Sequence, residues 1–546
     1  MDRRSFIRYG ASGALTASIS ANALQRVASA GGARIGPAPR PRPAFELEEM
    51  TISELMEHMG SGRYTARRLA ELYLERIESL DRQGPALHHM LEINSDALAT
   101  ADRLDEERRA GRVRGPLHGI PIIVKDNIDT ADMMTTAGSL ALVGAPPARD
   151  AFIMERLRAA GALILGKANL SEWANFRSSK SSSGWSALGG QGRNPYVLDR
   201  TPCGSSSGTG GGVCACYAAA GIGTETNGSI VCPSNANALV GIKPTLGLLS
   251  RSGVIPIAHS QDTPGPMART VADAAILLGA MTGEDPRDSA TVAAAGHALA
   301  DYTPFLDPRG LEGARIGVAR KHFFGYSPEA DRLAEDAIEA MKQAGAEIID
   351  PADIPHVGEY DDTQYTVLLY EFKADLNAYL AERQPESGVR TLRDLIEFNI
   401  ENRDREMPYF GQEIFELAEA KGPLTETEYL DALAKNHRLS REEGIDAVMD
   451  EHGLDVIVAP TGSPPWAIDV VNGDNYMGSS STPAAVAGYP NISVPAGYSH
   501  GLPVGISFIG KAWSEPTLIR IAYAFEQLTK HRRPPEFHPT LELNAG

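Results

Sequence analysis

The chain has 546 residues, enough for two or three average domains or for one large enzyme domain. Its composition is globular, with 42% hydrophobic residues, 22% charged residues and a mean hydropathy of −0.21. The net charge of −19 argues against nucleic-acid binding, which needs a basic surface, and no run of apolar residues is long enough to predict a membrane-spanning helix.

Residues 1–30 have the layout of an export signal. An adjacent Arg3-Arg4 pair precedes a weakly apolar run from Ala11 to Leu24, and small residues offer cleavage after Ala23 or Ala30. The paired arginines are similar to the twin-arginine signal type. A mobile amphipathic arm is the alternative, but it explains this order of basic, apolar and small residues less well. We therefore expect a periplasmic or secreted mature protein.

Residues 31–45 form a Pro-rich stretch that we interpret as a linker. Beyond it, no internal repeat and no break in composition divides residues 46–535. The sequence therefore predicts one large domain, which includes a charged, helix-rich section at about 360–450.

Three helices are predicted at the start of this domain. Thr51 and Glu54 have the spacing of a capping box in front of an apolar run, and Thr65 can cap a second helix. A charged third helix runs from about Ser95 to Arg109. The domain is therefore expected to begin with helices.

Strand and helix signals then alternate. The β-branched run Ile120–Val124 predicts a buried strand, with Lys125 standing at its end. Further strands are predicted at Ala162–Leu165, Ala314–Val318, Glu347–Ile349, Asp455–Val458, Asn491–Val494 and Val504–Ile509. Further helices are predicted at 150–160, Thr209–Ala220, 328–344 and about 515–529. This alternation predicts an α/β fold whose large sheet is covered by helices on both faces.

The stretch from Thr201 to Pro233 is the centre of the argument. It holds two Ser- and Gly-rich turns, one with three consecutive serines from Ser205 to Ser207 and one with Ser229. Such turns let backbone approach backbone and leave hydroxyl groups uncovered. Flexible surface loops are the general alternative for Gly/Ser tracts, but here apolar chain lies on both sides of them.

One match to a nucleotide-binding motif is spurious. Residues Gly161–Ala168 have phosphate-loop spacing through Lys167, but position 168 is Ala, where a Ser or Thr must bind magnesium. The four intervening residues are also apolar strand formers. We therefore interpret Lys167 as an ordinary loop lysine.

A second match stays open as a weaker hypothesis. Gly204–Gly208 (GSSSG) fits the nucleophile elbow of α/β-hydrolases, with Ser206 as nucleophile. That motif needs a strand leading directly into the turn. The preceding NPYVLDRTPC has two prolines and no strand pattern, which disfavours it.

The cysteines do not predict a metal site. All four lie in the central stretch, and Cys214 and Cys216 lack the paired spacing of a zinc site. In an exported protein Cys203 and Cys232 could form a disulfide that joins the two turns. Buried free thiols are at least as compatible with the sequence, so the pairing stays open. No metal and no other cofactor is expected.

The remaining residues can be combined into an acyl-transfer site. Serine needs a base to become a nucleophile, and a lysine can serve when burial keeps it neutral. Lys125, at the end of an apolar strand, is the candidate, and a serine of the first turn could pass the proton. The turn Thr226-Asn227-Gly228-Ser229 would direct successive N–H groups toward one point, as an oxyanion hole does.

Several motifs in fixed order resemble the amidase signature family. They are GIPIIVKDN, TPCGSSSGTG, GTETNGSIVCPSNANALVGIKPT and PIAHSQDTPGPMARTVADA, and the resemblance covers about residues 46–535. SEWANF, LLYEFK, AAVAGYP and GLPVGISFIGKAWSEP are most similar to its bacterial peptide amidases. The resemblance implies an amidase catalytic domain with helices around a large mixed β-sheet.

The family's Ser–cis-Ser–Lys triad carries over by position. It implies Ser229 as nucleophile, Ser205 as the serine with a cis peptide bond, Lys125 as base and Ser206 as support for the proton relay. One residue departs from the pattern: Asn227 stands where relatives usually carry Asp or Gly. Asn tolerates the left-handed conformation nearly as well, so the turn should survive, although substrate preference could change.

The resemblance implies hydrolysis of carboxylic amides, in particular the C-terminal amides of peptides or acyl amino acids, with release of ammonia. Trp173, Asn175 and Phe176 are expected near the substrate; for the two aromatic residues, simple core positions are equally compatible. The expected partner is a small-molecule or peptide amide, and the expected state is a monomer without nucleic acid or stable membrane association.

Three other functions stay open. A non-catalytic periplasmic binding protein would use the Gly/Ser turns as an anion-binding nest. An amidotransferase-type subunit would pass ammonia to a partner protein, a role that does not suit an exported chain. A broad-range aryl or acyl amidase would share the chemistry and differ in substrate.

Overall fold

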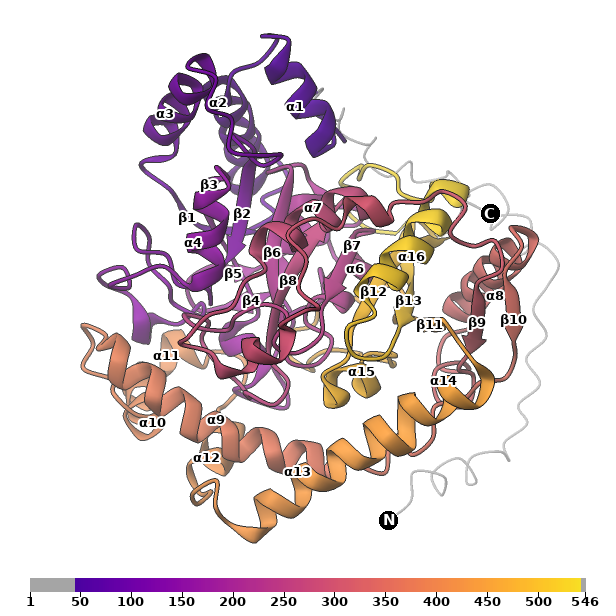
Figure 1. Cartoon of the computed structure of the whole chain (residues 1–546). Helices are drawn as coiled ribbons and strands as arrows, with labels where there is room; N and C mark the ends of the chain where they lie inside the picture. The colour runs from indigo at the N-terminus through magenta and orange to yellow at the C-terminus, as the bar shows by residue number, and fades with distance from the viewer. Residues whose placement is uncertain (1–44, 542–546) are drawn as a thin grey trace, which may run out of the picture. The chain divides into compact units, whose positions relative to one another are not determined.

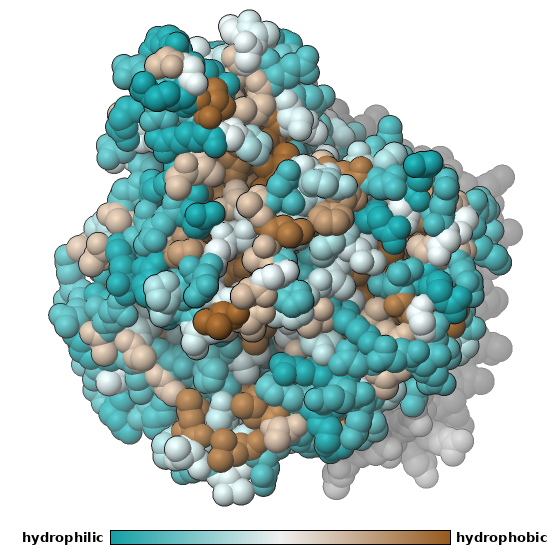
Figure 2. Space-filling view, in the orientation of Figure 1, coloured by the Kyte–Doolittle hydropathy of each residue, from teal (hydrophilic) through white to brown (hydrophobic). Residues whose placement is uncertain are grey.

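The computed structural model describes residues 45–541, so the predicted signal peptide and nearly all of the predicted linker lie outside the described residues. Within 45–541, no helix combines the length and apolar character that a membrane span requires. The face shown in Figure 2 is mostly hydrophilic, and its hydrophobic residues lie in small separate groups.

An eleven-stranded mixed sheet forms the centre of the fold, in the order β1-β3-β2-β6-β8-β7-β12-β13-β11-β9-β10 (Figure 1). Its two flanks, β3-β2-β6 and β11-β9-β10, are parallel, whereas the pairs from β6 to β11 are antiparallel. The strands are β1 (Met90–Ile93), β2 (Pro121–Lys125), β3 (Leu163–Ala168), β6 (Ala220–Glu225), β7 (Val240–Lys243), β8 (Thr263–Ala268), β9 (Arg315–Val318), β10 (Glu347–Ile349), β11 (Val456–Pro460), β12 (Asn491–Ser499) and β13 (Leu502–Ile509). A separate two-stranded ribbon joins β4 (Trp185–Ser186) to β5 (Gly190–Gln191).

Helices cover both faces of this sheet, as the sequence predicts. Every residue of the central strands β2, β3, β6, β7, β8, β11 and β13 is buried. Because successive side chains of a strand point to opposite faces, this burial requires cover on each side. The mixed α/β architecture is therefore confirmed.

The predicted helices are present with small shifts at their ends. Thr51 and Glu54 form the expected capping box, and the Thr65 side chain accepts a hydrogen bond from the N–H of Arg68. The helices are α1 (Ile52–Gly60), α2 (Ala66–Ile77), α3 (Ala97–Arg109), α4 (Phe152–Ala159), α5 (Ser207–Cys214), α6 (Val231–Ala236), α7 (Val271–Met281), α8 (Pro328–Gln343), α9 (Asp361–Arg383), α10 (Leu392–Glu401), α11 (Arg403–Glu406), α12 (Glu413–Glu419), α13 (Thr427–Ser440), α14 (Asp446–His452), α15 (Thr482–Ala487) and α16 (Glu515–Thr529).

The section around residues 360–450 consists of helices α9 to α14, drawn in orange below the sheet in Figure 1. Helix α9 packs on α13 through Val367 and Tyr370, and its other face joins a buried cluster that includes Phe372 and Phe415. Trp173 and Phe176, from the loop after β3, belong to the same cluster. This packing ties the helical section to the loops beside the central stretch.

Two predictions on secondary structure are wrong. The helix predicted over Thr209–Ala220 ends at Cys214, and Ala220 begins strand β6. Lys167 is not a loop lysine. It lies fully buried in β3, where its ammonium donates to the carbonyls of Ile128 and Met134 and forms a 3.2 Å ion pair with Asp126. Burial therefore makes Lys167 a structural member of the sheet.

Candidate active site

The two Ser/Gly-rich turns meet at the ends of strands β2 and β6. The first turn leads into helix α5, and the second connects β6 to α6. The N–H of Ser206 donates to the carbonyl oxygen of Ser229 at 3.3 Å, which joins the turns directly. The structure therefore brings together two segments that the sequence analysis singled out.

Lys125 is the last residue of β2, and its side chain is completely buried. Its Nζ lies 2.7 Å from Ser205 Oγ, 2.8 Å from Thr224 Oγ1 and 3.3 Å from the Thr224 carbonyl oxygen. Asn127 Nδ2 donates to the same Thr224 hydroxyl at 2.9 Å. The amine is thus held by neutral oxygens only, with no carboxylate in contact.

This environment favours the neutral amine. Burial lowers the pKa of Lys125 from 10.5 to about 7, and the more distant charges of Asp262 and Glu225 oppose this shift without cancelling it. A lysine with this pKa carries a free lone pair in a substantial fraction of molecules at neutral pH. It can therefore accept a proton from the hydroxyl beside it.

Ser205 is held on both sides of its hydroxyl. The peptide bond between Gly204 and Ser205 is cis, and the Ser205 carbonyl accepts from the N–H of Ser171 at 3.0 Å. A Cβ at position 204 would lie 2.1 Å from Ser171 Oγ, so only glycine fits there. The loop after β3 therefore supports the first turn.

Ser229 lies half-buried in the second turn, and its hydroxyl makes no hydrogen bond to any residue within 45–541. The N–H groups of Asn227, Gly228 and Ser229 likewise donate to no described residue. Gly228 has a φ of 83°, the left-handed region that glycine favours. A nucleophilic hydroxyl and several free N–H donors are thus available on one turn.

Buried groups fix the two ends of this turn. Thr226 Oγ1 donates to Asp262 Oδ1 at 2.5 Å, and Gln261 Nε2 donates to the Thr226 carbonyl at 3.0 Å. Behind Ser229, Glu225 accepts hydrogen bonds from the N–H groups of Ile230 and Val231. Sequence reasoning misses these supports, although the HSQD and GTET segments contain them.

The Ser206 hydroxyl is fully engaged with β6. It donates to the Thr224 carbonyl at 3.1 Å and accepts from the Thr224 N–H at 3.2 Å, and the residue is completely buried. This geometry contradicts the elbow hypothesis, because no free hydroxyl is left for attack. The relay support expected of Ser206 is supplied by its backbone, which holds the Ser229 carbonyl.

A cavity of about 570 Å³ opens onto Ser205, Ser229 and the turn between β6 and α6. One part of its wall is apolar and comprises Phe176, Ile257, Leu368 and Ile414. Asn175 also lines the cavity. Trp173 does not: it is buried with its ring edge-on to Phe415, so the core interpretation is the correct one for this residue.

The loop beside the cavity has an unusual backbone. Trp173, Ala174 and Asn175 have consecutive positive φ values of 49°, 54° and 69°. This conformation is costly for residues with a Cβ and persists only where the surroundings enforce it. It turns Asn175 and Phe176 toward the cavity while Trp173 anchors the loop in the core.

The cysteine question is answered by the structure. Cys203 and Cys232 form a disulfide with a Cα–Cα distance of 6.0 Å, and both residues line the cavity. Cys214 and Cys216 are free and buried. The bridge joins the segment before Ser205 to helix α6 after Ser229.

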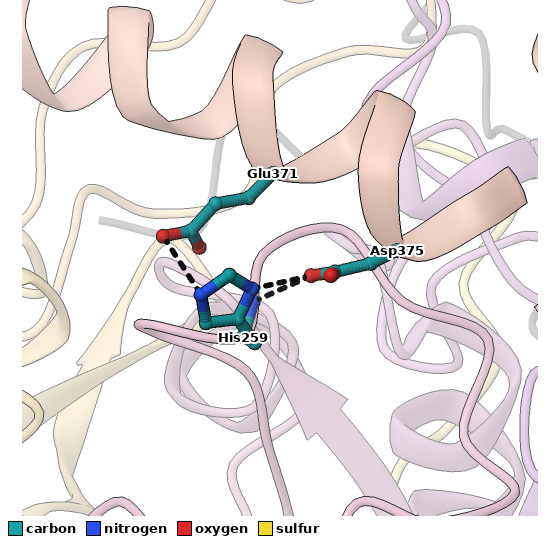
Figure 3. A group of neighbouring side chains, drawn as sticks. All are labelled: His259, Glu371 and Asp375. Carbon is teal, nitrogen blue, oxygen red and sulfur yellow. Dashed lines mark hydrogen bonds and ion pairs between the residues drawn. The ribbon is translucent and has the colours of Figure 1, made fainter. Parts of the chain in front are cut away.

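Within the described part of the chain, one group has the composition of a metal site: His259, Glu371 and Asp375 (Figure 3). The imidazole lies between the two carboxylates, with Nδ1 2.8 Å from Asp375 and Nε2 3.4 Å from Glu371. Burial opposes protonation of His259, but the two carboxylates outweigh it and raise its pKa. The three side chains therefore satisfy one another, and the group connects α9 to the loop that carries Asp262.

Comparisons with known proteins agree on one family. The amidase family model matches residues 68–519. A probable amidase of Arabidopsis thaliana is 45% identical over 504 residues, which cover 90% of this chain and 92% of that protein. A glutamyl-tRNA(Gln) amidotransferase subunit of Chloroflexus aurantiacus is 36% identical over 498 residues, covering 89% and 98%. The solved structure of the peptide amidase from Stenotrophomonas maltophilia matches with a TM-score of 0.87 and 49% identity, covering 90% of this chain and all of that one.

Proposed function

The chain belongs to the amidase family and hydrolyses amides, and from this premise we propose that it acts on the C-terminal primary amides of peptides or acyl amino acids. The observation that carries the proposal is the buried contact between Lys125 Nζ and Ser205 Oγ at 2.7 Å, beside a cavity that exposes Ser229. Only an acyl-transfer role uses all of these groups together.

In the proposed mechanism, neutral Lys125 accepts a proton from Ser205, which takes a proton from Ser229 as that oxygen attacks the amide carbonyl. The N–H groups of the turn Thr226–Ser229 hold the negative oxygen of the tetrahedral intermediate. The same relay in reverse protonates the departing nitrogen as the C–N bond breaks, leaving an acyl-enzyme on Ser229. A water molecule, activated by the same base, then releases the acid.

The preference for peptides is supported by the cavity and by a neighbour. A volume of about 570 Å³ suits a ligand of a few residues. Phe176, Ile257 and Leu368 can hold an apolar side chain, and Asn175 Oδ1, which has no partner within 45–541, can accept a substrate N–H. The similarity to a peptide amidase points the same way.

The substrate proposal is tested with purified protein that lacks residues 1–30. The protein is incubated with a C-terminally amidated dipeptide and with its methylamide, each in the presence of a chelator. We expect free acid and ammonia from the primary amide with the internal peptide bond intact, because the proposed chemistry uses no metal. Cleavage of internal bonds, or loss of activity with the chelator, would contradict the proposal.

Two further measurements separate the alternatives. Ammonia release by the chain alone is not expected of an amidotransferase subunit that depends on a partner. Stoichiometric labelling by a serine-reactive fluorophosphonate, lost in Ser229→Ala, is not expected of a binding protein. A panel of aryl and acyl amides then shows whether the specificity is broad.

The acid limb of the pH–rate profile reports the proposed base. Since Lys125 must be neutral, kcat/KM should fall as the pH drops through about 7, with a slope of one proton. The variants His118→Gln and His259→Gln should leave this midpoint unchanged, because the relay contains no histidine. Movement of the midpoint in either variant would reopen the case for a histidine base.

Export and oligomeric state are proposed on the sequence alone. Residues 1–30 are proposed to direct the chain out of the cytoplasm, and the mature enzyme is proposed to be a monomer. Fractionation of cells that express the full chain and its Arg3→Lys/Arg4→Lys variant tests the first proposal. Light scattering of the purified protein tests the second.

A further inference from the structure

The Asn227 side chain fixes the middle of the turn that carries Ser229. Its Oδ1 accepts a hydrogen bond from Ser481 Oγ at 2.7 Å, and its Nδ2 donates to Thr482 Oγ1 at 3.1 Å. Both partners lie at the start of α15, more than 250 residues away in sequence. No hydrogen bond from the described residues reaches the main chain of Asn227, so these two bonds are what hold it.

The neighbours of Asn227 are anchored differently. Thr226 is held by Asp262 and Gln261, and the carbonyl of Gly228 accepts from the N–H of Cys232 at 2.7 Å. The free N–H groups of the turn therefore take their direction from two fixed ends and one side-chain anchor. Loss of that anchor would leave the N–H groups of the middle of the turn free to rotate away.

The anchor continues as a chain of hydroxyl groups to the cavity mouth. Ser481 Oγ lies 3.1 Å from Ser479 Oγ, which accepts from the Tyr476 hydroxyl at 2.6 Å. Each hydroxyl has one proton to donate. Because Tyr476 donates to Ser479 and Ser481 donates to Asn227, Ser479 must donate to Ser481. The bonds all run in one direction, and such a chain strengthens each of its members.

The outer end of this chain is exposed to ligand. Tyr476 is 55% exposed, and its ring packs edge-on against Trp466 at 5.9 Å. Tyr476, Ser479, Ser481 and Asn227 all line the cavity that contains Ser229. A substrate extending outward from the reacting amide would cover Tyr476 and remove water from the first bond of the chain.

We propose that Asn227 is a positioning residue for the oxyanion turn, and that the chain Tyr476–Ser479–Ser481 couples occupancy of the cavity mouth to the alignment of this turn. The inference rests on the proposed function. Its consequence is that substrate residues remote from the scissile amide raise kcat and not only affinity, since their binding strengthens a contact that acts on the transition state.

The test compares an acetylated amino-acid amide with an amidated tripeptide that ends in the same residue. Tyr476→Phe removes only the hydroxyl. We expect it to lower kcat for the tripeptide amide by roughly 3- to 10-fold, with KM nearly unchanged, and to leave kcat for the short amide unaltered. Tyr409→Phe is the matched control, because Tyr409 is also exposed and packs edge-on against a tryptophan, Trp185, but lies outside the cavity.

Variants at position 227 test the anchor itself. Asn227→Ala should lower kcat on both substrates by about 10- to 100-fold, somewhat less than the loss of a whole oxyanion donor. Asn227→Asp should restore most of it, since a carboxylate accepts from Ser481 and from the Thr482 hydroxyl. A Tyr476→Phe effect on KM alone, or equal effects on both substrates, would overturn the coupling. Normal kcat in Asn227→Ala would overturn the anchor, and a wild type that releases no ammonia from either amide would instead overturn the proposed function.

Discussion

Replacing Ser229 with alanine is expected to lower kcat by about 10³- to 10⁶-fold, the range found when a catalytic nucleophile is removed. The hydroxyl of Ser229 has no hydrogen-bond partner within residues 45–541, so its loss leaves no buried group unsatisfied. The fold should therefore be unaffected, and the whole effect should appear in the chemical step. Steady-state rates on a peptide amide, together with thermal unfolding, measure both.

Ser207→Ala is the matched control for this experiment. Ser207 belongs to the first Ser-rich turn, is buried, and its hydroxyl has no partner among the described residues. Its removal should therefore leave kcat near the wild-type value. If Ser229→Ala kept an appreciable rate, or if Ser207→Ala were equally inactive, another serine would have to be the nucleophile.

The sequence predicts the outer parts of the sheet better than its centre. Strands such as β9, β11 and β13 are runs of branched apolar residues and are correctly located. At β6 the sequence instead predicts the end of a helix, because Gly221 and Gly223 interrupt the apolar pattern of the strand. A Cβ at Gly221 would lie 2.7 Å from the Thr209 side chain, so these glycines serve the close packing of α5 on the sheet. Close packing of this kind removes the pattern by which a strand is recognised.

Strand β8 is absent from the predicted strands for a related reason. Its sequence, TPGPMA, has prolines at positions 264 and 266, which argue against a central strand. Both prolines pair with β6, while the pairing with β7 involves only Met267 and Ala268. The prolines can thus lie where β8 has an open side, an arrangement that depends on strand order and not on local sequence.

The candidate site shows the same division. Short motifs identify Lys125, Ser205 and Ser229, because each lies in a segment of unusual composition. The groups that hold them are not predicted: Thr224 beside Lys125, Asp262 beside Thr226, and the hydroxyl chain from Tyr476 to Asn227. Their residue types are ordinary, and contacts across 36 to 255 residues of sequence give no local signal.

Lys125→Met is expected to lower kcat/KM by about 10³-fold or more, because no other group can accept the proton from Ser205. The double variant with Ser205→Ala should be little worse than either single variant, since the two residues act in one relay. Rates of the three proteins at about pH 8, where the wild-type amine is mostly neutral, measure this directly. Independent, multiplying losses would show that Lys125 and Ser205 contribute separately, which would contradict the relay.

The same variant tests the state of the amine through stability. The pKa of Lys125 is about 7 in the fold and near 10.5 when unfolded, so between these pH values the unfolded chain binds one more proton. The free energy of unfolding of the wild type should therefore rise relative to that of Lys125→Met by about 1.4 kcal/mol per pH unit above about pH 7. Below about pH 7 the difference should be constant, because both states of the wild type are then protonated. Parallel urea titrations from about pH 6 to about pH 9 measure this difference, and a constant value across the whole range would mean that Lys125 stays charged in the fold and cannot be the base.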